Sequence, residues 1–304
     1  MDVDSTAENV KRTDAPDWRR LYPFASHYLN LEDVRLHYLH EGQGTPVLFV
    51  HGNPTWSFYW RRLVLALRER YRVVVPDHVG CGLSDKPRRY PYHLADRIHD
   101  LLHLIEFLDL DNLTVVGHDW GGAIATGAAL RMPRRVRRLV LMNTGAFPPP
   151  YVPWPLLFFR IPLLGTLAVR GANLFLKGAL RWATCRPERW DAVMRAGYLA
   201  PYDSWSNRVA IDRFVKDIPL SPRHPTWYTL KRIEAGLPFL ENQPACIVWG
   251  MQDWCFTRVC LERLRRLLPQ AEVHCLPQAG HWLVEDAPEE VIDRVSDFLA
   301  RTDG

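Results

Sequence analysis

The sequence predicts an α/β protein built on a mostly parallel, doubly wound sheet with an inserted helical cap. Short apolar runs alternate with amphipathic stretches through most of the chain, as expected for parallel strands joined by crossover helices. Between 147 and 234 this pattern gives way to helical fragments rich in Pro, Trp and Arg, without a clear buried strand. We therefore expect an N-terminal arm over 1–25, an α/β core over 26–146 and 235–304, and a helical cap over 147–234.

The first half of the chain accounts for most of the expected sheet. A turn at Glu41-Gly42-Gln43-Gly44 favours neighbouring strands at 34–39 and 46–50. The next expected elements are a helix over 60–70, a strand over 71–75, a loop over 77–86, a helix over 94–108 and a strand over 113–116.

The second half continues the alternation on both sides of the cap. A strand at 139–142 precedes the cap, and the sheet resumes with a strand at 245–249. A helix over 258–268, a strand over 273–276 and a closing helix with an apolar face from 291 to 299 complete the expected core.

Composition narrows the class of protein. The chain has 304 residues, of which 47% are hydrophobic and 24% charged, as in an ordinary soluble globular protein. Its net charge of +4 comes without a basic stripe interleaved with aromatic residues, so nucleic acid is not an expected partner. Residues 1–20 are too polar for a secretory signal, and the apolar segment 154–180 is interrupted too often for a transmembrane segment. We therefore expect a cytoplasmic protein.

Six cysteines are spread through the chain without a C-x-x-C pair or a partnered histidine spacing. This spacing predicts neither a zinc site nor a disulfide framework. We expect buried free thiols and no bound metal.

One turn carries the strongest local signal. The apolar run 113–116 leads into Gly117-His118-Asp119-Trp120-Gly121-Gly122, and the small-residue stretch 123–129 follows. A buried strand, a Gly-bounded turn and an Ala-rich helix describe the nucleophile elbow of an α/β-hydrolase. The central residue here is Asp119 and not Ser. A carboxylate that attacks a saturated carbon forms an alkyl ester, whereas a serine would acylate itself. An Asp in an ordinary Gly-bounded loop is the alternative interpretation.

Four polar residues each follow a predicted strand, namely Asn53, Asp119, Asp253 and His281. Ligands bind outside the carboxyl ends of strands in open parallel sheets, so we expect these side chains to meet at one edge. Their order along the chain, nucleophile then acid then histidine, is that of the α/β-hydrolase triad. Each also has a local explanation: Asp253 can cap a helix, His281 can be a core or loop histidine, and Asn53 can serve the turn before Pro54.

Four motifs resemble the haloalkane dehalogenase family, across essentially the whole chain after the arm. They are His51-Gly52-Asn53-Pro54-Thr55-Trp56, Gly117-His118-Asp119-Trp120-Gly121-Gly122, Trp249-Gly250-Met251-Gln252-Asp253 and Gly280-His281-Trp282. The resemblance implies an α/β-hydrolase core with a helical cap and neither a metal nor an organic cofactor. It makes Asp119 the nucleophile, His281 the base that activates water, and Asp253 the acid that orients the histidine.

The resemblance also assigns Asn53 and Trp120 as side-chain N–H donors to the departing halide. A leaving anion needs donors but no general acid, and a carboxamide and an indole supply such donors. Trp120 could instead be a packing aromatic beside the elbow. The implied partners are a small hydrophobic substrate, water and a halide ion, and the sequence leaves a homo-oligomer open.

Asn143 distinguishes the chain from part of this family. In that part, a Glu acid follows the preceding strand, where this chain has Asn143 and must therefore rely on Asp253. Another branch has no Asn after His-Gly and takes its second halide donor from a Trp of the cap. The combination of Asn53 with Asp253 resembles the third subgroup.

That subgroup contains or closely borders β-lactone decarboxylases of bacterial long-chain olefin synthesis. The stretches 79–87, 201–208 and 213–220 resemble both groups. A strained lactone and an alkyl halide each present an electrophilic carbon and expel an anion, so one set of residues can serve either. We expect haloalkane dehalogenation, with cis-β-lactone decarboxylation as the alternative.

Two other classes are compatible with the elbow. An epoxide hydrolase also uses an Asp nucleophile but needs phenol donors from the cap, for which Tyr151, Tyr198, Tyr202 and Tyr228 are the candidates. A ligand-binding receptor without activity could use the same fold, although a complete triad argues against it.

Overall fold

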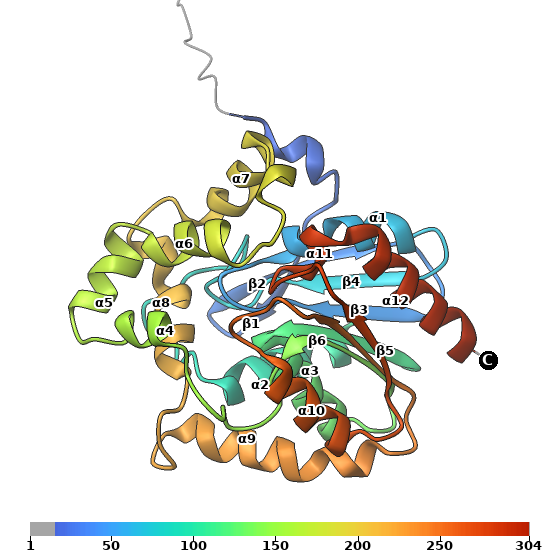
Figure 1. The fold of residues 1–304 in the computed structure, drawn as a ribbon. Helices are drawn as coiled ribbons and strands as arrows, with labels where there is room; N and C mark the ends of the chain where they lie inside the picture. The colour runs from blue at the N-terminus through green and yellow to red at the C-terminus, as the bar shows by residue number, and fades with distance from the viewer. Residues whose placement is uncertain (1–15, 304) are drawn as a thin grey trace, which may run out of the picture.

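The computed structural model describes residues 16–303 and has one eight-stranded sheet at its centre (Figure 1). The strand order is β1-β2-β4-β3-β5-β6-β7-β8. The strands are β1 (His27–Leu31), β2 (Val34–Glu41), β3 (Pro46–Val50), β4 (Arg72–Pro76), β5 (Leu113–Asp119), β6 (Val136–Thr144), β7 (Ala245–Gly250) and β8 (Glu272–Leu276). All strands from β4 to β8 in this order pair in parallel, whereas β1 and β2 are antiparallel to their neighbours. The predicted mostly parallel α/β sheet is confirmed.

The expected pairing at the start of the sheet is wrong. The strands after and before the turn at 41–44 are not neighbours, because β4 lies between β2 and β3 and pairs with both. The turn packs against the end of the helix Arg61–Leu67, which follows it in the chain, and a Cβ at Gly42 would lie 2.1 Å from the carbonyl oxygen of Arg68. The turn residues alone suggested a hairpin. In the structure, β4 forms the hydrogen bonds with both β2 and β3 that direct pairing of these two strands would have used.

Helices cover both faces of the sheet. The helices are α1 (Arg61–Leu67), α2 (Leu94–Phe107), α3 (Trp120–Arg131), α4 (Trp154–Phe158), α5 (Leu164–Thr166), α6 (Leu174–Trp182), α7 (Ala192–Leu199), α8 (Val209–Asp217), α9 (Pro225–Gly236), α10 (Arg258–Leu267), α11 (Leu283–Asp286) and α12 (Pro288–Thr302). Helices α1, α11 and α12 contribute to one apolar cluster, and α2, α3, α9 and α10 contribute to the cluster on the other face (Figure 1). This arrangement is the doubly wound sheet that the alternating pattern predicts.

All elements of regular secondary structure between β6 and β7 are helices. Helices α4 to α8 gather on one side of the sheet, whereas α9 runs beneath α2 and α3 (Figure 1). Leu230 and Ile233 of α9 are buried in the same cluster as α2 and α3. The last helix of the expected cap segment 147–234 therefore packs on the core.

The expected arm over 1–25 falls partly outside the described residues. Its described end packs on the core: the short 3-10 helix Trp18–Leu21 places the ring centre of Trp18 5.5 Å from that of Trp56. Tyr22 is buried in the same cluster. Aromatic burial thus anchors this stretch, which its polar neighbours in the sequence did not indicate.

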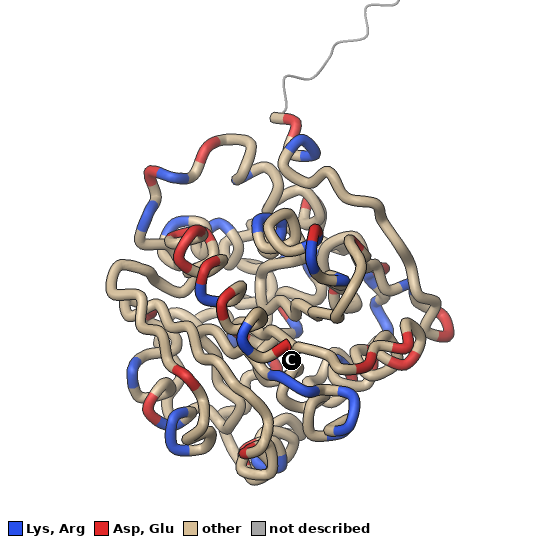
Figure 2. Tube along the Cα trace, turned by 90° about the vertical axis from the view of Figure 1, so that its right-hand side faces the viewer, with Lys and Arg blue, Asp and Glu red and all other residues tan. Residues whose placement is uncertain are grey.

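Charges of both signs are interspersed over the side of the molecule seen in Figure 2. Within residues 16–303, no helix is both long and apolar enough to cross a membrane. The six cysteines are free, and three of them are buried, namely Cys81, Cys246 and Cys260.

Candidate active site

Asp119 lies at the junction of β5 and α3, where the backbone takes a conformation that favours glycine. Its φ and ψ are 54° and −128°, and the register between β5 and β6 shifts at this residue. After the turn, α3 approaches β3 closely. Gly121 permits this approach, because a Cβ at this position would lie 2.0 Å from the carbonyl oxygen of Val50. The strand, the turn and the helix thus have the geometry of the predicted elbow.

The carboxylate of Asp119 is buried and held by backbone donors. The backbone N–H of Asn53 donates to Oδ1 over 2.7 Å, and a Cβ at Gly52 would collide with the carboxylate. Burial raises the pKa of Asp119 above its ordinary value, while His281 and the backbone N–H groups of Asn53 and Trp120 counteract that rise. One oxygen is therefore fixed by the backbone, and the other lies 3.8 Å from His281 Nε2.

His281 lies between the two carboxylates. Its Nδ1 is 2.8 Å from Asp253 Oδ2, so this nitrogen carries the proton of that hydrogen bond. Its Nε2 is 3.8 Å from Asp119 Oδ2, which is beyond hydrogen-bonding distance. Burial lowers the pKa of His281, but Asp253 and then Asp119 more than offset this effect, so the pKa lies above its ordinary value.

Asp253 is positioned by Asn143, whose contribution the sequence did not reveal. The Nδ2 of Asn143 donates to Asp253 Oδ2 over 2.9 Å, and its Oδ1 accepts from the backbone N–H of Gly250. Asn143 is fully buried and has a positive φ of 32°. Backbone N–H groups of Cys255 and Phe256 donate to the other oxygen of Asp253. The acceptor of His281 is thus fixed from several sides.

His118 is a second positioning residue that motif matching left without a role. Its Nε2 lies 2.8 Å from the carbonyl oxygen of His281. Burial and the neighbouring His281 keep the pKa of His118 well below its ordinary value, so this ring is neutral and donates to that carbonyl. The signal was available in the sequence, since His118 precedes Asp119 within the elbow motif.

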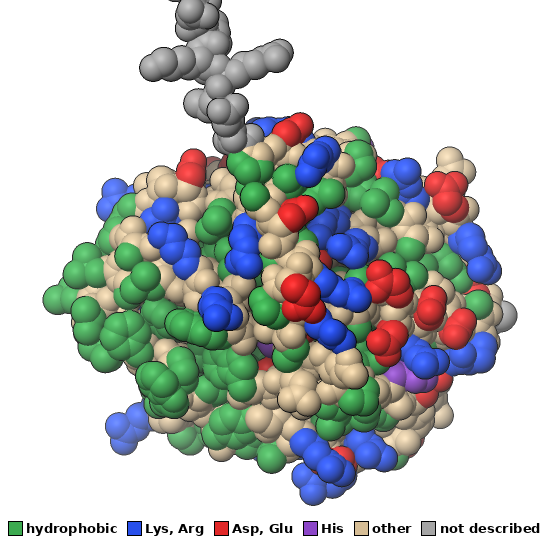
Figure 3. Space-filling model, turned by 45° about the horizontal axis from the view of Figure 1, so that its top comes forward, with side chains coloured by type: hydrophobic (Ala, Val, Ile, Leu, Met, Phe, Trp, Pro, Cys, Tyr) green, Lys and Arg blue, Asp and Glu red, His purple; other side chains and the backbone are tan. Residues whose placement is uncertain are grey.

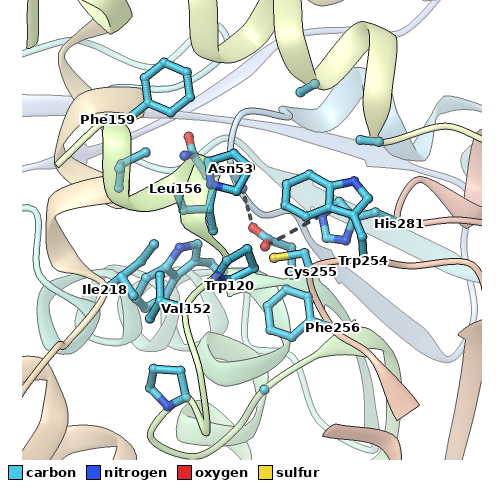
Figure 4. Close-up of a pocket in the computed structure, with 18 of the residues that line it drawn as sticks. Asn53, Trp120, Val152, Leu156, Phe159, Ile218, Trp254, Cys255, Phe256 and His281 are labelled. Atoms are coloured by element: carbon cyan, nitrogen blue, oxygen red, sulfur yellow. Dashed lines mark hydrogen bonds and ion pairs between the residues drawn. The ribbon is translucent and has the colours of Figure 1, made fainter. Parts of the chain in front are cut away.

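The two predicted anion donors lie beside Asp119. Asn53 and Trp120 both line the cavity that contains the Asp119 carboxylate (Figure 4). The Nδ2 of Asn53 is 3.5 Å from the carbonyl oxygen of Ile211, a contact at the outer limit of a hydrogen bond. The ring of Trp120 packs 5.8 Å from that of Phe214. Trp120 thus packs against a neighbour and also lines the cavity, and its role as an anion donor stays a prediction.

A largely apolar cavity of about 840 Å³ surrounds these residues. Figure 4 shows His281 on one side of the cavity and Ile218 on the opposite side, with Asn53 and Trp120 between them. The remaining wall comes mainly from α4, α6 and the loop after β7, through Val152, Trp154, Phe175, Ala179, Trp182, Ile218, Trp254, Cys255 and Phe256 among others. Such a volume admits a substrate with extended hydrocarbon chains.

The four candidate phenols are committed elsewhere or lie at the surface. Tyr151 donates to the carbonyl oxygen of Cys255, Tyr202 donates to that of Thr55, Tyr198 donates to Glu285, and the side chain of Tyr228 is exposed. Within the described part of the chain, none of these phenols contacts Asp119. Tyr151 lines the same cavity as Asp119, but its hydroxyl donates to the backbone at Cys255, and the other three phenols do not line the cavity. This arrangement does not favour the protonation of an alkoxide by a phenol, as an epoxide hydrolase requires.

One group of potential metal ligands lies away from this cavity. Atoms of Cys246, Glu272 and His274 on β7 and β8 lie within 4.8 Å of one another. However, Glu272 pairs with Arg301 over 2.5 Å, and burial raises the pKa of the Cys246 thiol far above its ordinary value. These contacts describe an edge-strand ion pair beside a buried thiol, and not a preformed thiolate site.

The chain belongs to the alpha/beta hydrolase fold family, whose model matches residues 45–288. It is 45% identical to a cis-3-alkyl-4-alkyloxetan-2-one decarboxylase of Shewanella oneidensis, over 93% of this chain and 91% of the relative. It is 33% identical to haloalkane dehalogenase 2 of Mycobacterium tuberculosis, over 90% of this chain and 94% of the relative. The crystal structure of haloalkane dehalogenase DatA from Agrobacterium tumefaciens superposes with a TM-score of 0.82 at 24% identity, over 91% and 96% of the two chains. The resemblance predicted from the motifs is confirmed.

Proposed function

We propose that this protein is an enzyme in which Asp119 attacks a substrate carbon and is transiently esterified. The observation that carries the proposal is the Asp119 carboxylate inside a largely apolar cavity, with one oxygen bound by the backbone and the other 3.8 Å from His281 Nε2. Asn53 and Trp120 would stabilise the anion expelled by this attack. Helices α4 to α8 would act as the cap over the cavity.

The substrate that we propose is a β-lactone with two alkyl substituents in cis. Support comes from the 45% identity to an oxetanone decarboxylase, against 33% to a haloalkane dehalogenase, at similar coverage. The cavity of about 840 Å³ has room for alkyl chains on both ring carbons. Asn53 and Trp120 are suited to the carboxylate that leaves when the ring opens.

The atoms of this reaction balance without water. Asp119 Oδ2 bonds to ring carbon C4, the C4–O bond breaks, and the released carboxylate stays attached to C3. The C2–C3 bond then breaks to release carbon dioxide, its electron pair forms the alkene, and the C4–Oδ2 bond breaks to restore the Asp119 carboxylate. Inversion at C4 followed by anti elimination converts a cis lactone into a cis alkene. His281, paired with Asp253, would balance the negative charge on Asp119 and on the opened substrate.

Haloalkane dehalogenation is the second candidate, and the separation between His281 and Asp119 favours it. At 3.8 Å from Asp119 Oδ2, Nε2 is too far to take part in a direct hydrogen bond but close enough to act on a water between them. In this reaction Asn53 and Trp120 would donate hydrogen bonds to the departing halide. The alkyl ester on Asp119 is then hydrolysed, which releases an alcohol. The same resting site thus supports both reactions, which differ in whether water attacks the ester.

Turnover in water labelled with oxygen-18 separates the two reactions. We expect a cis-3,4-dialkyl-β-lactone to give an alkene and carbon dioxide, with no label in the Asp119 peptide by mass spectrometry. Dehalogenation of a bromoalkane would instead incorporate oxygen-18 into the Asp119 peptide, because water attacks the ester on Asp119. In His281→Phe, the same bromoalkane should leave its alkyl group attached to Asp119. Asp119→Asn is the matched control and should be inactive on both substrates. Turnover by Asp119→Asn at the wild-type rate would contradict the proposal.

A further inference from the structure

Helices α4 to α6 expose an unusual number of large apolar side chains. Nine of the 19 exposed large hydrophobic residues in the described part of the chain fall between 154 and 182. We call these nine the apolar patch: Trp154, Leu157, Phe158, Ile161, Leu163, Leu164, Leu167, Leu174 and Trp182. Figure 3 shows hydrophobic side chains gathered on this side of the molecule. A patch of this kind on a monomeric surface marks an interaction site.

The most exposed residue of the apolar patch has a strained backbone conformation. Leu163 lies in the loop between α4 and α5, has a φ of 61° and exposes 82% of its surface. A leucine in the left-handed region costs conformational energy, and here that conformation presents an apolar side chain to solvent. Neither the strain nor the exposure helps the folding of an isolated chain, so both point to a surface that is covered in use.

The patch carries positive charge and no negative charge of its own. Between residues 120 and 187 the sequence contains no Asp or Glu, whereas 151–187 contains Arg160, Arg170, Lys177, Arg181 and Arg186. Arg160 donates to backbone carbonyl oxygens of α8. Lys177 and Arg181 of α6 are exposed between the patch residues Leu174 and Trp182, and Lys177 also donates to the carbonyl oxygen of Ala172. Apolar side chains next to exposed cations complement an anionic, amphiphilic surface.

The cavity opens within this patch. Trp154 and Trp182 line the cavity and yet expose 79% and 70% of their surfaces, so α4 and α6 flank its entrance. Tryptophan is favoured at the level of lipid headgroups, because its ring is apolar and its N–H is polar. A molecule dissolved in hydrocarbon could therefore pass from such a surface into the cavity without crossing water.

We propose that the apolar patch docks on the surface of a lipid bilayer that carries anionic headgroups. Trp154, Leu163 and Trp182 enter the headgroup region, and Lys177 and Arg181 lie against phosphate groups. The entrance of the cavity then faces the hydrocarbon. This docking does not depend on which reaction Asp119 performs.

Flotation of the full-length protein with large unilamellar vesicles tests the docking. We expect binding to vesicles of phosphatidylglycerol and phosphatidylcholine in equal parts, and weaker binding to phosphatidylcholine alone. Trp154→Ser/Leu163→Ser should weaken binding at least about tenfold, because two apolar anchors are lost. Lys177→Glu/Arg181→Glu should weaken binding to the anionic vesicles by roughly fivefold or more for each cation replaced. Asp119→Asn should bind like the wild type, which separates docking from catalysis.

The matched control is Phe239→Ser, since Phe239 exposes 85% of its surface but lies outside the patch, directly after α9. It should bind vesicles as the wild type does. Equal losses in Phe239→Ser and Trp154→Ser/Leu163→Ser would overturn the proposal, as would wild-type protein that binds neither kind of vesicle. A wild-type dimer that Leu163→Ser dissociates, with vesicles left unbound, would assign the patch to a second copy of the chain and also overturn it.

Discussion

The pKa values of Asp119 and His281 are both raised, but for different reasons: burial dominates at Asp119, and neighbouring charges dominate at His281. Burial dominates at Asp119 and raises its pKa, because the backbone donors and His281 compensate only in part. At His281 the carboxylates of Asp253 and Asp119 outweigh burial, so the charged form is favoured. A buried carboxylate with a raised pKa thus lies next to a histidine whose pKa is also raised.

Replacing Asp253 by Asn should lower the pKa of His281. The change removes the largest charge that stabilises the imidazolium, whose pKa in the wild type lies above the ordinary value of 6.5. Hydrolysis of an ester on Asp119 needs neutral His281, so its rate should rise with pH through that pKa. In Asp253→Asn this limb should move to lower pH, with a plateau lowered by roughly 10³ to 10⁴, as for a misoriented triad histidine.

Titration of the His281 ring nitrogens by NMR measures this pKa directly, and the pH dependence of ester hydrolysis measures its consequence. A His281 pKa that is the same in Asp253→Asn and the wild type would contradict the assignment of Asp253 as its partner.

The elbow depends on close contact between elements that are distant in the sequence. Gly121 at the start of α3 lies against the end of β3, and Thr144 at the end of β6 donates through Oγ1 to the carbonyl oxygen of Asp119. The strained conformation of Asp119 is thus maintained by the strands on both sides of β5. At the element scale, the glycines of the motif serve packing as much as backbone freedom.

Gly121→Ala should destabilise the protein by about 1–3 kcal/mol or more, because its Cβ would meet the backbone of Val50 at 2.0 Å and neither element can move freely. The free energy of unfolding by urea denaturation measures the effect. Gly171→Ala is the matched control, since the Cβ added there meets only a ring atom of Trp205 at 3.8 Å. Equal stability of the two variants would contradict the close packing of α3 on β3.

A buried ionic group links the helices beyond the sheet to the core. Arg61 of α1 forms two hydrogen bonds with Glu285 of α11, and Tyr198 of α7 donates to the same carboxylate. All three residues are almost completely buried. This group fixes α7 over the core, where the ring of Tyr198 stacks on that of Trp282, a residue of the cavity wall.

Arg61→Met should cost about 3–5 kcal/mol, because it leaves the buried Glu285 without its counterion. Thermal unfolding followed by circular dichroism measures the loss. Arg61→Met/Glu285→Leu should recover part of it, since no unpaired charge is left. Arg135→Ala, which breaks an exposed pair with Asp109, should cost much less, because solvent screens this pair. Similar losses in Arg61→Met and Arg135→Ala would show that the buried group does not link the two layers.

The sequence by itself determined the α/β class, the order of most core elements, although not β1, and the four strand ends that carry Asn53, Asp119, Asp253 and His281. These features follow from local periodicity and from the common edge at which parallel strands end. Tertiary structure alone decided that β4 separates β2 from β3, that α9 packs on the core, and that Asn143 holds Asp253. It also decided the shape of the cavity and the exposure of the patch around its entrance. The physical reason is that strand pairing, helix docking and burial depend on contacts between distant segments, which a local pattern does not encode.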